Sequence, residues 1–235
     1  MPGRGHGSIG DARVMPELVY ENWQRGHTLH RLILIGVTIC FGFASGQAVA
    51  QEAIGSVSRV QGEASGVRGN STQVLGVDTP VFLNEVVSTG PAARLEVTFK
   101  DDTKLTLGEK SKLTLDRYVF DPSARRGTIR FRIVGAFRFL SGQVSKLVRS
   151  NVNVMTPVAT IGIRGTEFWG GPIDNQALGV FLIEGRVRVS NAAGARTLNR
   201  PGQGTNIARP GAAPGAVTLW PPDKVNRAIA TVTFQ

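Results

Sequence analysis

From Gln51 onward, apolar and polar side chains alternate in short runs separated by glycine, asparagine and aspartate. In residues 93–99, for example, Leu95, Val97 and Phe99 alternate with charged or hydroxyl side chains. Because successive side chains of a β-strand point to opposite faces, this pattern predicts strands that bury one face. Regular strands with glycine at the corners suit a twisted β-solenoid or a rolled β-sandwich, so we expect an all-β fold of one of these types.

The same alternation of apolar and polar residues predicts further strands along the chain. The turn-like segments 100–103 and 108–111 lead to apolar pairs that begin at Leu105 and Leu113, which predicts a meander. Strands are also expected at the segments 129–133, 137–139, 152–154 and 180–189 and around Val144. Glycine precedes a strand-like run at Gly55, Gly142 and Gly185, and the spacings are close to multiples of about 43 residues. They suggest a weak internal repeat.

Helix is expected at one place only, residues 222–232, so the fold should contain at most one short C-terminal helix. Pro222 can open a helix, since its missing N–H would be unsatisfied there anyway. The apolar residues that follow it fall on one stripe. Ahead of it, residues 209–215 have the composition of a linker or an extended arm, and residues 121–127 that of a softer joint.

The first fifty residues have the layout of a secretory signal peptide. An apolar run at residues 32–44 follows a basic segment and precedes small residues at Ala48 and Ala50, where signal peptidase needs them. Cleavage would make Gln51 the new N-terminus. The alternative is a membrane anchor at residues 32–50, for which the uncharged run is just long enough.

Histidine and cysteine are confined to these first fifty residues: His6, His27, His30 and Cys40. The rest of the chain therefore cannot supply a Ser-His-Asp or Cys-His nucleophile, or the usual zinc, haem and iron–sulfur ligands. Disulfides are excluded there as well. We expect no catalytic residue, no metal and no cofactor, and an enzyme would have to use carboxylates, lysine or serine alone.

The chain is basic, with a formal net charge of +10. Residues 1–50 contribute only +1, so about +9 remains afterwards, and long-range attraction favours anionic partners. Arg130 and Arg132 alternate with apolar residues and should share an outward face, and Arg138 follows closely. These three form a candidate stripe for an anionic partner; the alternative is a solvated strand edge whose charge prevents aggregation.

Residues 156–168 are the most distinctive segment. Pro157 fixes its own φ and biases Thr156 to an extended conformation. Gly162 leaves room for close approach, and Gly165 permits a positive φ. Arg164 is expected to pair with Glu167 or Glu184, or to contact a ligand. The candidate signature residues, which we expect to be structural, are Thr156, Pro157, Ile161, Gly162, Ile163, Arg164, Gly165, Thr166 and Phe168.

This segment resembles the signature of the FecR-domain family, an all-β bacterial module found outside the cytoplasmic membrane. The resemblance covers roughly residues 57–206. Besides the signature it includes residues 87–102 before it, residues 135–142 leading into it, and residues 185–204 after it. It implies a FecR-like β domain at 51–208, followed by an arm and short helix at 209–235.

The resemblance also carries expectations about function. Family members with a full architecture are sigma-factor regulators with a cytoplasmic anti-sigma segment, one membrane span and a periplasmic domain that senses an outer-membrane receptor. Because only about 31 residues precede the apolar run, we expect a periplasmic or secreted, non-enzymatic module that binds an envelope protein or an anionic polysaccharide. Nucleic acid is not expected as a partner, because of export, and a membrane only if the N-terminal segment is retained. The alternative is an inner-membrane regulator of a sigma factor with a short cytoplasmic segment, residues 1–31.

Overall fold

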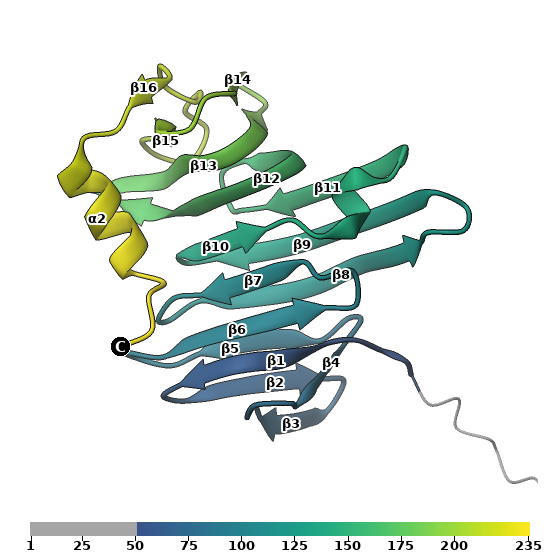
Figure 1. Ribbon diagram of the computed structural model, residues 1–235. Helices are drawn as coiled ribbons and strands as arrows, with labels where there is room; N and C mark the ends of the chain where they lie inside the picture. Colours follow the sequence, from purple (N-terminus) through teal and green to yellow (C-terminus); the bar gives the residue numbers. More distant parts are fainter. Residues whose placement is uncertain (1–50) are drawn as a thin grey trace, which may run out of the picture. The chain divides into compact units, whose positions relative to one another are not determined.

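The computed structural model describes residues 51–235, in which sixteen strands form one continuous sheet that folds over into two layers (Figure 1). The expected apolar run, the cleavage residues Ala48 and Ala50 and the segment 1–31 lie outside the described residues. None of the helices in residues 51–235 is both long enough and apolar enough to cross a membrane.

The two layers are defined by strand pairing. The rear layer contains, in spatial order, β3 (Ser71–Val74), β2 (Ala64–Arg68), β5 (Val86–Thr89), β8 (Lys112–Asp121), β9 (Arg126–Val134) and β11 (Arg149–Met155). The front layer contains β10 (Phe137–Leu140), β7 (Lys104–Leu107), β6 (Arg94–Phe99), β1 (Ala53–Gln61) and β4 (Pro80–Phe82).

Two long strands join the layers at one end. β12 (Thr160–Ile173) pairs with β11 through its first half and with β10 through its second half, and β13 (Gln176–Asn191) follows it along its whole length. β14 (Gly194–Leu198) and β15 (Gln203–Ile207) pair with the two halves of β13, and β16 (Thr218–Leu219) pairs with β15. All pairs are antiparallel except β9 with β11. The all-β prediction is confirmed, and of its two forms the rolled sandwich is the one observed.

The main core lies between the layers. Leu95, Val97 and Phe99 of β6 point inward and are at most 2% exposed, as the alternation predicted. Phe99 stacks on Phe131 of the rear layer, with ring centroids 4.8 Å apart. Each fully buried side chain of this size stabilises the fold by roughly 1.5–3 kcal/mol.

A second apolar cluster lies on the outer side of the front layer. Phe168 belongs to the main core, so its neighbour Trp169 points the other way and packs with Phe181 and Trp220. The helix α2 (Pro222–Ala230) lies beside β12 and β13 (Figure 1), and its buried Ala228 belongs to this cluster. The helix predicted at 222–232 is therefore confirmed, and packing holds it, as expected for nine residues.

A buried carboxylate fastens the turn between β6 and β7. Asp101 is fully buried and accepts hydrogen bonds from Thr103 Oγ1 (2.7 Å), Tyr118 Oη (3.0 Å) and the amide of Val144 (3.1 Å). Burial, reinforced by the negative charge of Asp101, raises the pKa of Tyr118. Val144 itself lies in the 3₁₀ turn η1 (Gln143–Lys146), so the strand expected there is wrong.

Three other expectations about connections are also wrong. The meander does not continue past β7, because the segment 108–111 crosses to the rear layer, where β8 pairs with β5 and β9. The glycine repeat has no structural counterpart, since Gly55 and Gly185 lie inside strands and Gly142 precedes η1. The segment 121–127 is the tight hairpin between β8 and β9 rather than a joint.

The segment 209–215 is tied to the sheet. Asn191 Nδ2 donates a hydrogen bond to the carbonyl of Ala212 (2.7 Å), and Thr205 Oγ1 donates one to that of Gly215 (2.9 Å). The arm therefore packs on the domain.

Candidate functional site

The signature segment occupies the corner where the sheet passes from one layer to the other. Its residues form the turn before β12 and the first half of β12 itself. Thr156 closes that turn: its amide and its hydroxyl both donate to the carbonyl of Ala159, at 2.8 and 3.0 Å. Ile161 and Ile163 then point into the core between the layers, as does Phe168 beyond the corner.

Two facing glycines make the corner. Gly165 on β12 has φ +56° and Gly185 on β13 has φ +84°, conformations that L side chains rarely adopt. A Cβ built on Gly185 would lie 2.0 Å from the carbonyl oxygen of Gly165. The pairing of β12 with β13 is irregular between Arg164 and Glu167, which is where the strand bends.

Thr166 satisfies the backbone groups that this bend frees. Its hydroxyl donates to the carbonyl of Arg186 (2.7 Å) and accepts from the amide of the same residue (3.1 Å). Its amide donates to Ser141 Oγ at 2.6 Å. The bend of the backbone at the corner therefore depends on three residues: Gly165, Thr166 and Gly185.

Gly162 is different, because packing does not require a glycine there. A Cβ built on it would lie 3.5 Å from Asn153 Oδ1 and 3.9 Å from the carbonyl oxygen of Arg188, which are ordinary contacts. Gly162 lies on the outer face of the rear layer, since its neighbours Ile161 and Ile163 are buried. Among the described residues, Asn153 Oδ1 is the one side-chain atom within 4 Å of such a Cβ.

The structure does not bring the three stripe arginines together. Arg130 and Arg132 share the outer face of β9 in the rear layer, as predicted. Arg138 lies on β10 in the front layer, which pairs with β7 and β12 and not with β9. A stripe through all three is therefore wrong, because neighbours in sequence enter different layers.

Two of these arginines are ion-paired. Arg132 donates two hydrogen bonds to the carboxylate of Asp116, at 2.6 and 2.8 Å, and this contact raises the pKa of Arg132. Arg138 pairs with Glu167, with Nε 2.6 Å from Oε1. Glu167 is therefore taken by Arg138 and not by Arg164, so that expected pairing is wrong. Arg164 is exposed and stands directly opposite Arg186 on β13.

Arg130 belongs to a row that crosses six strands of the rear layer and its extension. Successive strands bring the following residues opposite one another: Arg117, Arg130, Asn153, Gly162, Arg188 and Thr197. We call these six residues the basic row. No acidic residue stands in it. Sequence reasoning missed the row because its members come from strands far apart in the chain, although each one alternates with buried neighbours.

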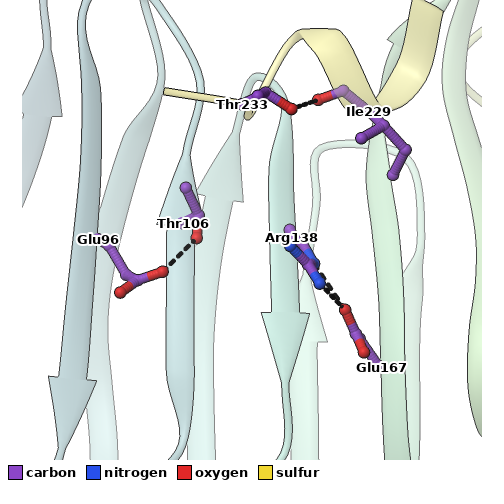
Figure 2. A network of polar contacts seen from close by, with 6 residues as sticks. All are labelled: Glu96, Thr106, Arg138, Glu167, Ile229 and Thr233. Atoms are coloured by element: carbon purple, nitrogen blue, oxygen red, sulfur yellow. Dashed lines mark hydrogen bonds and ion pairs between the residues drawn. The ribbon is translucent and has the colours of Figure 1, made fainter. Parts of the chain in front are cut away.

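A hollow of about 190 Å³ lies on the front layer and is lined by Glu96, Lys104, Thr106, Arg138 and Leu140. The carboxylate of Glu96 accepts hydrogen bonds from Ser58 Oγ (2.9 Å) and Thr106 Oγ1 (3.2 Å). Figure 2 shows the Glu96–Thr106 contact with the Arg138–Glu167 pair nearby. The polar groups of Glu96, Thr106 and Arg138 have partners within the fold, so these residues have the features of a structural network. Within residues 51–235 no group of three or more histidine, cysteine, aspartate or glutamate side chains could hold a metal ion.

Comparison with known proteins places the corner and most of the basic row inside one family domain. Residues 85–188 match the family described as FecR protein, a stretch that runs from the start of β5 through most of β13. No curated protein matches the chain.

Two crystal structures of a "putative anti-sigma factor" from Parabacteroides distasonis ATCC 8503 are similar to the chain, at 16% and 15% sequence identity and a TM-score of 0.48 each. Each alignment covers 60% of this chain and 62% of the other, so the chain spans less than two thirds of that protein. The family match rests on its own, and it identifies residues 85–188 as a FecR domain, as the resemblance implied.

Proposed function

We propose that this protein is a regulator of the FecR type. Residues 51–235 would form a sensory β domain outside the cytoplasmic membrane that binds another envelope protein. The segment before it would span the membrane and present residues 1–31 to a sigma factor. The observation that carries this proposal is the FecR match over residues 85–188, which covers both layers and the corner between them.

The chemistry of the described residues supports binding rather than catalysis. Histidine and cysteine are absent from the sequence after Cys40. The buried carboxylate of Asp101 accepts hydrogen bonds from four donors of its own fold, which leaves it no free position for acid–base work. Several unpaired arginines, among them Arg130, Arg164 and Arg188, lie on an exposed sheet face, the setting of a docking surface.

A second candidate function is a free exported binding module. One observation favours it: the compact unit begins at Gln51, directly after the expected cleavage residue Ala50, and its first strand begins at Ala53. Signal peptidase would therefore release the whole β domain, and binding would have no direct link to the cytoplasm.

Intact mass and N-terminal sequencing of the protein from fractionated cells separate the two functions. The regulator predicts an uncut chain in the inner-membrane fraction, and residues 1–31 used as bait should recover a sigma factor. A chain that begins at Gln51 in the soluble exported fraction would overturn the regulator and leave the free binding module.

A further inference from the structure

The outer face of the rear layer concentrates positive charge that the fold does not neutralise. Arg164 stands opposite Arg186, and Arg117 stands opposite Arg130. Like charges at directly opposite positions destabilise a sheet. Within residues 51–235, none of these four arginines, nor Arg188, forms an ion pair. Two uncompensated like-charge pairs in one layer indicate that this face meets an anion.

At the centre of this outer face the surface is recessed and its flanking groups are polar. Gly162 has no side chain, and Asn153 and Arg188 flank it in the basic row. Asn153 Nδ2 donates to Asn151 Oδ1, so the oxygen of the Asn153 amide is the atom that faces the space above Gly162. That oxygen can accept a hydrogen bond from an N–H group of a ligand that lies along the row.

From these features we propose that an acidic peptide segment of a partner protein binds in extended form along the basic row, with its backbone over Gly162. Arg130 and Arg188 are three strand spacings apart, or about 14 Å. An extended peptide advances about 3.3 Å per residue, so carboxylates four residues apart span a matching ~13 Å. Each arginine can hold a carboxylate through its planar fork, and Asn153 Oδ1 accepts a backbone N–H.

The row suits a peptide better than a lipid surface. Binding at a membrane interface uses apolar and aromatic side chains together with the positive charge. The basic row contains arginine, asparagine, glycine and threonine only, and the aromatic cluster of the domain lies on the front layer under α2. The choice of a protein over an acidic polysaccharide rests on the proposed function.

Fluorescence anisotropy can test the proposal with the full chain, carrying an affinity tag after Gln235. The probe is a labelled peptide of about twelve residues, roughly 40 Å when extended, in which glutamate alternates with threonine. A second peptide with glutamine in place of glutamate is the control ligand. We expect the glutamate peptide to bind and the glutamine peptide not to, with affinity falling as salt is added.

Three variants then locate the binding surface. Arg130→Ala/Arg188→Ala should weaken binding of the glutamate peptide about ten-fold. Arg200→Ala/Arg209→Ala removes the same charge from exposed loop positions outside the row and should leave binding unchanged. Gly162→Ala fits the fold, so its unfolding midpoint should be no lower than that of the native protein, yet it should weaken binding about three-fold by covering Asn153 Oδ1.

Equal affinities for the two double variants would overturn the proposal. So would binding of polygalacturonate, or of vesicles of phosphatidylglycerol and phosphatidylcholine, through Arg130 and Arg188 when the glutamate peptide does not bind. Neither result tests the proposed regulator function, which is decided by cell fractionation and by the experiment with residues 1–31 as bait.

Discussion

At the scale of single residues, two glycines of the β12–β13 region illustrate two reasons for the same residue type. Gly185 is required by geometry, because its φ is positive and its α-carbon lies against the carbonyl of Gly165. Gly162 has ordinary strand geometry and room for a methyl group. The first glycine shapes the fold, and the second leaves an outer surface open.

Replacement of Gly185 by alanine should destabilise the protein strongly. The new Cβ would meet Gly165 O at 2.0 Å, and backbone strain adds to this collision, so we expect a loss of at least about 3 kcal/mol. Urea denaturation followed by far-UV circular dichroism measures it. Gly69→Ala is the matched control, because Gly69 has φ +57° but nothing within 4 Å, and should lose only about 1–2 kcal/mol. Equal losses would show that the corner is not tightly packed.

Tyr118 should make stability depend on alkaline pH. Its pKa is raised in the folded protein, so it favours folding fully below its unfolded pKa of about 10 and loses this contribution as pH rises towards the folded value. Tyr118→Phe removes the hydrogen bond to Asp101 and should cost about 1–3 kcal/mol at pH 7. The stability difference between the two proteins should narrow above about pH 10, by up to ~1.4 kcal/mol per pH unit. A constant difference from pH 7 to pH 11 would contradict this coupling.

At the scale of elements, the sequence was a good guide to strands and a poor guide to their partners. The run 93–99 appears as β6 and the proline-led segment 222–232 as α2, because alternation and capping are local signals. The sequence could not predict the crossing after β7 or the placement of Arg138 in the front layer, because both depend on pairing between strands that are far apart in the chain. The same limit hid the basic row, although the outward direction of Arg130 and Arg132 was predicted correctly.

The docking of α2 should depend on Ala228. This residue is fully buried beside Trp169 and Trp220, so Ala228→Glu would bury an unpaired carboxylate and should detach the short helix. Exposure of both indoles should shift tryptophan emission to longer wavelength and increase quenching by acrylamide, while the far-UV strand signal stays. Asn226→Glu, at an exposed position of the same helix, should change neither signal. An unshifted spectrum in Ala228→Glu would mean that α2 does not shield the cluster.

At the scale of the whole molecule, the rolled sheet has open edges. β3 lies at one end of the strand order, and all four of its residues are exposed, including Val74 at 84%. Val67 and Val77 are exposed in the neighbouring segments. An edge strand without lysine, proline or a bulge can pair with another chain, so this end is where self-association should begin.

Val74→Lys should therefore reduce self-association at high protein concentration. The lysine side chain projects into solvent at this exposed position, so the free energy of unfolding should change by less than about 0.5 kcal/mol. Light scattering during prolonged incubation compares the two proteins. Thr72→Lys places the same charge on the same strand without removing apolar surface. Aggregation that persists in both variants would exclude β3 as the pairing edge.

The position of β1 has a mechanical consequence. The described chain starts just before β1, which pairs with β4 through residues 53–56 and with β6 through residues 55–61. A force applied to Gln51 along this strand would load the hydrogen bonds of both pairings in shear, all at once, rather than break them one after another. If the domain is attached through Gln51 and a partner bound to its rear layer pulls on it, β1 would therefore resist unfolding at the point of attachment.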